Sequence, residues 1–147
     1  DYGLVRQLKK AHPGLEIVLN GGITSIEQGL AELDAVAGVL MGRADYPEPW
    51  RLLAIDPLVF GQPAPFASAK EAAIALIPYL ESELGKGTRL HAVTRHMLGL
   101  FNGHPGARRW RRVLSEAGTR GGGPEILGEA LAAVARTAEA RPEPVAA

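Results

Sequence analysis

The sequence predicts a parallel α/β segment followed by an all-α segment. Two short apolar runs, 17–19 and 36–41, each end at a glycine-containing turn and alternate with helical patterns over short joints, which is typical of a parallel sheet. A proline-rich stretch at 61–67 then reads as an extended linker. From 68 to 138, apolar residues recur at helical spacing with short breaks, which predicts four helices in a small bundle.

The α/β segment occupies residues 1–60. The expected elements are a helix over 2–11, a strand over 16–19, a helix over 26–33, a strand over 36–41 and a last helix ending at Phe60. Thr24-x-x-Glu27 and Ser25-x-x-Gln28 both have capping-box spacing, so either residue can start the middle helix. Pro57 predicts a bend in the last helix. Two strands cannot cover a sheet, so this segment is expected to need neighbours.

The all-α segment begins at Ser68, which caps its first helix. The expected helices cover 68–84, 89–101, 106–117 and 125–138. Pro78 lies inside the first of them and predicts a kink. Gly103 is expected to end the second helix in a left-handed conformation, and Pro105 to stand as the first residue of the third. Residues 139–147 are expected to form a disordered tail.

The two glycine turns predict one shared anion site. At Gly21 and Gly22 the missing Cβ lets backbone N–H groups approach a ligand, and the N-terminus of the following helix is expected to face the same anion. Gly42 allows a second close approach, and Arg43 offers a planar cationic donor suited to phosphate. In (β/α)₈ barrels a phosphate typically sits between the loops after strands seven and eight. For either turn alone, a simple corner in the chain is an equal alternative.

The net charge of zero hides an asymmetry. Residues 1–62 carry five Lys/Arg and eight Asp/Glu, whereas residues 85–120 carry eight Lys/Arg and only Glu116. Placing Trp110 and Leu114 in the core turns Arg108, Arg111 and Arg112 toward solvent. Such a row attracts polyanions, and the alternative is a solvated face that keeps the domain soluble.

Several classes of protein are disfavoured. The chain has no cysteine, which excludes disulfides and thiol chemistry supplied by these residues. The four histidines lack the spacing and companions of a metal site, so no metal is assigned. No apolar run has spanning length and no signal-peptide pattern is present, so a cytoplasmic location is expected.

Two later segments are long enough to be specific. They are Thr94-Arg95-His96-Met97-Leu98-Gly99-Leu100-Phe101 and Pro105-Gly106-Ala107-Arg108-Arg109-Trp110-Arg111-Arg112. With Asn20-Gly21-Gly22-Ile23-Thr24-Ser25 and Gly42-Arg43-Ala44, they resemble the C-terminal part of the bacterial tRNA-dihydrouridine synthases of subfamily A. The resemblance extends from the first helix to about Ala130.

The resemblance implies the last two βα units of an FMN-binding (β/α)₈ TIM barrel at 1–60, a linker at 61–67 and a helical tRNA-binding domain at 68–138. Such enzymes reduce a uridine in the D-loop of tRNA to 5,6-dihydrouridine with NADPH. By position, the residues that would bind the FMN phosphate are Asn20, Gly21, Gly22, Gly42 and Arg43. The leading tRNA contacts would be Arg108 and Arg111, with Arg112 and Arg95 behind them.

The family's pattern also has parts without a counterpart here. Its first barrel strands carry a cysteine general acid and a lysine and a histidine near the flavin, so the chain is expected to be a fragment that holds no catalytic residue and is inactive alone. The full-length protein is expected to be a monomer. Ala37 and Ala92 replace an aspartate and a histidine common in the family, which affects local packing or one polar contact.

Two other readings of the residues remain open. One is a non-catalytic RNA-binding helical module that carries a barrel remnant. The other is a phosphate-binding barrel enzyme with a small-molecule substrate and a merely solvated basic face. The arginine-rich segment weighs against the second of these, and the coding sequence upstream of Asp1 would decide between the enzyme and the module.

Overall fold

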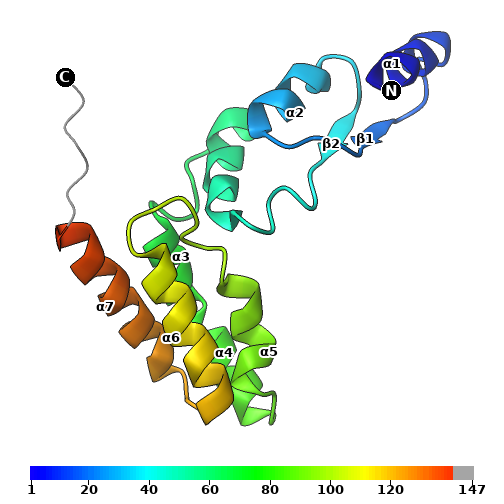
Figure 1. Ribbon diagram of the computed structural model, residues 1–147. Helices are drawn as coiled ribbons and strands as arrows, with labels where there is room; N and C mark the ends of the chain where they lie inside the picture. Colours follow the sequence, from blue (N-terminus) through cyan, green and yellow to red (C-terminus); the bar gives the residue numbers. More distant parts are fainter. Residues whose placement is uncertain (141–147) are drawn as a thin grey trace.

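The computed structural model describes residues 1–140, which form two groups of elements (Figure 1). The first group comprises helix α1 (Tyr2–Ala11), strand β1 (Val18–Asn20), helix α2 (Ile26–Leu33) and strand β2 (Gly38–Leu40), and lies at one end of the molecule. The second comprises α3 (Ala69–Ala75), α4 (Ile77–Gly85), α5 (Leu90–Thr94), α6 (Ala107–Arg120) and α7 (Glu125–Ala140). The described chain is therefore a helix-rich α/β structure with a two-stranded sheet.

The two strands pair in parallel, as the sequence predicts, with Val18 opposite Gly38 and Asn20 opposite Leu40. Helix α2 connects them and begins at Ser25, whose hydroxyl accepts a hydrogen bond from the Gln28 N–H at 3.1 Å. Ser25, and not Thr24, is therefore the N-cap. A small core of Leu19, Ile23 and Val36 lies within this unit, because side chains of α1 and of both strands converge there.

The helix expected to end at Phe60 is two short helices of different type. A 3₁₀-helix covers Pro49–Ala54, and a π-helix covers Asp56–Phe60. Proline has no N–H to donate and is best placed at the start of a helix. Pro49 stands in the first turn of the 3₁₀-helix and Pro57 in the first turn of the π-helix. The change of helix type falls at Ile55, which keeps helical backbone angles, next to the bend predicted from Pro57.

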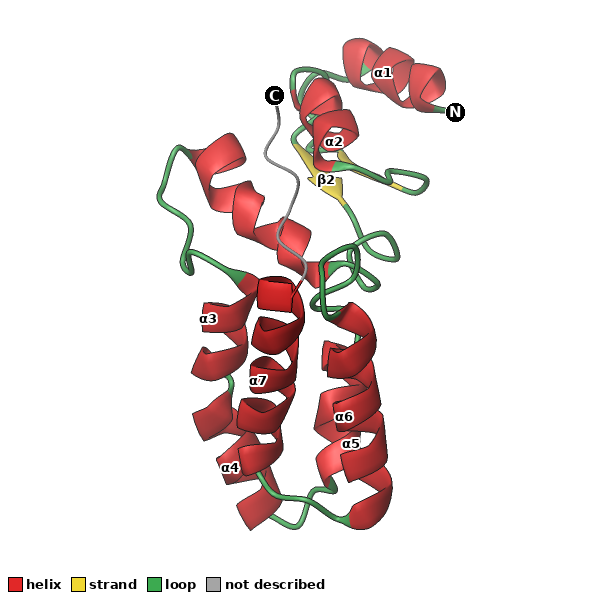
Figure 2. Ribbon diagram, turned by 60° about the vertical axis from the view of Figure 1, so that its left-hand side comes forward, coloured by secondary structure: helices red, strands yellow, loops and turns green. Residues whose placement is uncertain are grey.

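Helices α3 to α7 surround a separate apolar core (Figure 2). Trp110, Leu80, Leu114 and Leu127 are its large, fully buried members. Helix α6 packs against both α5 and α7, so its buried stripe joins the two sides of the group. Residues 61–67 contain no helix or strand and connect this group to the first.

Several details differ from the helical prediction, and one is that α6 ends at Arg120 and not at Ala117. The first helix is broken, because α3 ends at Ala75 and Pro78 stands in the first turn of α4, where its missing N–H costs nothing. Helix α5 stops at Thr94 and is followed by a 3₁₀ turn over Arg95–Met97. Gly106 has φ of +89°, so α6 begins after it and not at Pro105. Helix α7 includes residues 139–140, and the rest of the expected tail lies outside the described residues.

After the 3₁₀ turn the chain does not return to an α-helix, and a contact with α6 contributes to this. The carbonyl of Met97 accepts the N–H of Leu100 at 3.0 Å and the indole N–H of Trp110 at 2.7 Å. A continuing α-helix would need that carbonyl for the N–H of Phe101. The chain instead turns and reaches Gly103, which has the predicted left-handed φ of +83°.

Within residues 1–140, no helix has both the length and the apolar character needed to cross a membrane.

Candidate functional site

One pocket at the carboxyl ends of the two parallel strands contains both glycine turns. Its volume is about 460 Å³. It is lined by Asn20, Gly21, Gly22, Ile23, Thr24, Leu40, Gly42, Arg43 and Ala44. All five residues expected at an anion site therefore meet in one place, because parallel strands end at the same edge of a sheet.

The first turn needs glycine. Gly21 and Gly22 have φ of +104° and +76°, a region that other residues rarely adopt. A Cβ on Gly22 would also lie 3.1 Å from the hydroxyl of Tyr2. That hydroxyl donates a 2.8 Å hydrogen bond to the carbonyl of Gly21, so α1 holds the turn in place. Sequence reasoning missed Tyr2, because nothing local marks a contact between residues so far apart in the chain.

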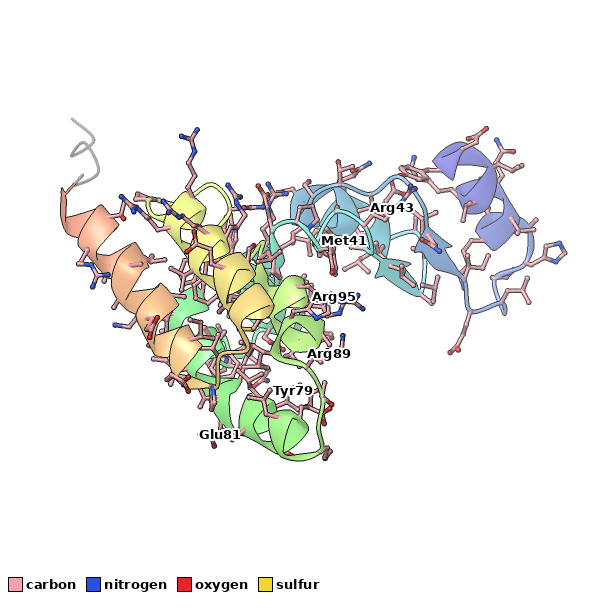
Figure 3. The ribbon with its side chains drawn as sticks, turned by 60° about the horizontal axis from the view of Figure 1, so that its bottom comes forward. Met41, Arg43, Tyr79, Glu81, Arg89 and Arg95 are labelled. Carbon is pink, nitrogen blue, oxygen red and sulfur yellow. The ribbon has the colours of Figure 1, made fainter. Side chains whose placement is uncertain are left out.

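The pocket offers donors and one cation. The backbone N–H groups of Gly22, Ile23, Arg43 and Ala44 donate no hydrogen bond to any residue of the described chain. The Arg43 side chain is exposed and forms no ion pair within residues 1–140 (Figure 3). Unpaired N–H groups and a guanidinium at the same pocket fit the oxygens of a phosphate.

The N-terminus of α2 contributes less than expected. Backbone N–H groups at this helix end already have partners in the same segment. The Ser25 hydroxyl accepts the N–H of Gln28, and the Gln28 side-chain oxygen accepts the N–H of Thr24 at 2.9 Å. Hydrogen bonds from its own backbone N–H and from Ser25 lower the pKa of Glu27 below its ordinary value. The carboxylate of Glu27 is thus the anion at this helix end, and the turns themselves supply the donors of the pocket.

The predicted orientation of α6 is confirmed. Trp110 is 0% and Leu114 1% exposed, whereas Arg108, Arg111 and Arg112 are exposed, as is Arg109. Arg112 is paired with Glu116 at 2.7 Å, and this carboxylate raises the pKa of Arg112 above its ordinary value. Arg111 instead donates to the neutral amide oxygen of Asn102. The arginines of this row are therefore not electrostatically equivalent.

A groove between α6 and α7 lies next to this row. Its volume is about 650 Å³, and its cationic residues are Arg109, Arg112 and Arg136. Arg136 comes from α7, a helix for which the sequence predicts only packing. The arginines of α6 therefore belong to a basic surface that extends onto a second helix.

The basic surface is joined to the segment that follows Arg43. The hydroxyl of Tyr46 lies 2.7 Å from Nδ1 of His96, and the amide nitrogen of Asn102 donates to the carbonyl of Pro47 at 2.6 Å. The indole of Trp50 donates to the Asn102 carbonyl at 3.0 Å. Arg95 in turn donates to Nε2 of His96 at 3.0 Å. The structure thus connects the glycine-turn pocket and two of the predicted arginines through a few side chains.

Metal ligands do not gather in the part of the chain that the structure describes. Across residues 1–140, no three His, Asp or Glu side chains come together in a way that would hold an ion.

Comparison with known proteins gives the same assignment as the motifs. The family model described as "Dihydrouridine synthase (Dus)" matches residues 1–138. The chain is 46% identical over 136 residues to a protein of Escherichia coli K12 and 45% identical over 128 residues to one of Shewanella oneidensis. A protein of Vibrio cholerae is 42% identical over 135 residues. Each of these relatives is named tRNA-dihydrouridine(20/20a) synthase.

The alignments cover most of this chain but a smaller part of each relative. They include 86% to 92% of the chain and 38% to 41% of the relatives' own length. The family match covers nearly every described residue, including both glycine turns and the arginine row. The chain therefore belongs to the dihydrouridine synthase family.

Proposed function

We propose that this chain supplies the FMN phosphate site and the tRNA-binding surface of a tRNA-dihydrouridine synthase that reduces a D-loop uridine to 5,6-dihydrouridine with NADPH. Residues 1–60 would be the last two βα units of a TIM barrel, and residues 68–138 a tRNA-binding domain. The observation that carries the proposal is the convergence of both glycine turns in one pocket, within a chain that belongs to this family.

The residues present fit the phosphate of FMN. Gly21 and Gly22 line the pocket with positive φ, which allows a close approach to backbone donors, and Arg43 provides the opposite charge. When bound, FMN supplies the hydride that reduces the uracil ring. The chain's own contribution is to hold the cofactor's phosphate at one end and the RNA backbone on the arginine row of α6. A base turned out of the RNA stack can then be presented to the cofactor.

The cofactor half is tested in a completed chain, in which residues 1–147 are joined behind the N-terminal part of the Escherichia coli relative. Arg43→Ala should lower bound flavin because it removes the cation, and Gly22→Val should abolish it because a side chain is strained at φ of +76° and would collide with Tyr2. Flavin absorbance of the purified protein measures both. Arg51→Ala is the control, since Arg51 is paired with Glu48 outside the pocket. Undiminished flavin in both variants would refute the site.

The RNA half is tested in the 147-residue chain itself. Replacing Arg108 and Arg111 together by alanine should weaken tRNA binding and lower the slope of log affinity against log salt by about one unit for each lost phosphate contact. Lys70→Ala on α3 is the control for an exposed cation. An unchanged slope would leave a solvated face. If the wild-type chain binds tRNA but its completed form holds no flavin, the non-catalytic RNA-binding module is the correct reading.

A further inference from the structure

Two of the arginines expected to contact tRNA, Arg111 and Arg95, are each linked through one side chain to the segment just after the Gly42-Arg43 turn. Arg111 donates to the side-chain oxygen of Asn102, whose amide nitrogen donates to the carbonyl of Pro47 at 2.6 Å. Arg95 donates to His96, which bonds the hydroxyl of Tyr46 at 2.7 Å. Tyr46 and Pro47 follow Arg43 by three and four residues.

We infer that Asn102 and His96 are positioning residues, which hold Arg111 and Arg95 ready for the RNA backbone at a fixed place relative to the phosphate-binding turn. The inference rests on the proposed function, because it takes the arginines as tRNA contacts. It adds a role for Asn102 and His96, two side chains to which the sequence reasoning assigned no part in RNA binding.

Asn102 is suited to this role because its amide has two unlike ends. The oxygen accepts from Arg111 and the nitrogen donates to Pro47, so both contacts require one orientation of the amide. The absence of charge on the Asn102 amide, the partner of Arg111, also matters. Glu116 partly cancels the charge of Arg112, whereas Asn102 orients Arg111 and leaves its full charge for a phosphate.

His96 makes an equivalent link. Arg95 Nε always carries a hydrogen, so Nε2 of His96 must be the acceptor. In the neutral imidazole, Nδ1 then carries the ring hydrogen and donates to the Tyr46 hydroxyl oxygen. The imidazole ring is therefore held by Tyr46 on one side and orients the guanidinium of Arg95 on the other.

The segment Tyr46-Pro47, to which both links lead, is tightly packed. A Cβ on Gly99 would lie 2.8 Å from the carbonyl carbon of Pro47, so only glycine allows this approach. Trp50 bonds the backbone carbonyl of Asn102 and stacks edge-on against His104, with ring centroids 4.7 Å apart. Because these contacts do not involve the Asn102 side chain, Asn102→Ala can remove the link between Arg111 and Pro47 while the packing around Pro47 is retained.

The experiment is a double-mutant cycle on tRNA binding by the 147-residue chain, with salt titrations of each variant. Arg111→Ala should lower the salt slope by about one unit. Asn102→Ala should weaken binding about two- to tenfold, because Arg111 must then be ordered during binding, but should leave the slope unchanged, because the charge remains. In the Arg111→Ala background, Asn102→Ala should have no further effect.

The His96 link is tested by rescue. His96→Leu should weaken binding by a similar factor, and His96→Gln should restore it, because an amide again offers an acceptor to Arg95 and a donor to Tyr46. Tyr46→Phe removes only the hydroxyl of a residue that is 59% exposed, so it leaves the core intact. Tyr79→Phe is the matched control on α4, at the end of the helices far from Arg43 (Figure 3).

The outcomes separate the inference from the function on which it rests. Equal losses from Asn102→Ala with and without Arg111 would show a general structural role and overturn the inference, as would no loss at all. A change of salt slope in Asn102→Ala would overturn it too. If wild-type protein fails to bind tRNA, the proposed function itself is wrong. Near-ultraviolet circular dichroism of each variant confirms that the Trp110 core is intact.

Discussion

The hydroxyl of Tyr2 donates a 2.8 Å hydrogen bond to the carbonyl of Gly21, nineteen residues later in the chain. This bond holds the first glycine turn, and the hydroxyl occupies the space that a Gly22 side chain would need. Helix α1 is held in turn by Arg6, which forms an ion pair with the buried carboxylate of Glu32 in α2. The turn is thus braced by two helices and not only by its own backbone.

We expect Tyr2→Phe to weaken flavin binding by the completed chain about threefold to tenfold, since the net value of one hydrogen bond is about 0.5–1.5 kcal/mol. The ring stays, so the packing of α1 is retained. Flavin release during dilution, followed by fluorescence, measures the dissociation constant. Tyr79→Phe serves as the control, and equal flavin affinity in the two variants would show that the Tyr2 bond does not support the turn.

The pairing of Arg112 with Glu116 predicts unequal contributions from the arginines of α6. Arg112→Ala should lower the salt slope of tRNA binding by less than Arg111→Ala, because a carboxylate 2.7 Å away already neutralises part of its charge. Glu116→Gln should strengthen tRNA binding at low salt. Filter-binding titrations between low and moderate salt test both, and identical slopes for the two arginine variants would be evidence against this distinction.

The buried carboxyl group of Asp45 predicts that the free energy of unfolding depends on pH. The residue is 7% exposed, its Oδ1 has no partner in the described chain, and burial raises its pKa, partly offset by Arg51. A raised pKa means that the folded state favours the protonated acid, so stability is highest at acidic pH and falls as pH rises through the folded-state pKa. Asp45→Ala should therefore stabilise the chain at neutral pH, by about 1 kcal/mol, and much less at pH 4.

Urea unfolding at the two pH values measures the Asp45 effect in the completed chain. Asp34→Ala is the matched control, because Asp34 is exposed at the end of α2. A gain from Asp45→Ala that is the same at both pH values would mean that ionisation is not its source.

The first 60 residues should be less protected than the C-terminal helices in the 147-residue chain. Leu4, Leu8, Val18, Leu40 and Phe60 are exposed, and each strand has three residues. Helices α6 and α7 share a core with fully buried Trp110 and Leu127. Amide hydrogen exchange followed by mass spectrometry should show fast exchange in 1–60 and slow exchange in α6 and α7. Uniform protection over both parts would contradict this expectation.

Features governed by neighbouring residues were predictable from the sequence. The bounds of α1, the parallel pairing of the strands and the outward row of Arg108, Arg111 and Arg112 all follow from periodicity, because a helix or strand repeats its geometry over a few residues. The glycine turns are likewise predictable, because positive φ at Gly21 and Gly22 favours glycine. Binding of FMN and tRNA at these positions stays a prediction.

Helix ends and the supports of the site were decided by the tertiary structure. The 3₁₀ turn after α5 ends where the Met97 carbonyl accepts the Trp110 indole N–H, and Asn102 acquires its role only because Pro47 lies against it. These partners are thirteen and fifty-five residues apart, and no local pattern encodes such a meeting. The sequence alone therefore determined which residues have the chemistry for an anion and for RNA. Folding alone determined how those residues are held together, because that depends on contacts between distant parts of the chain.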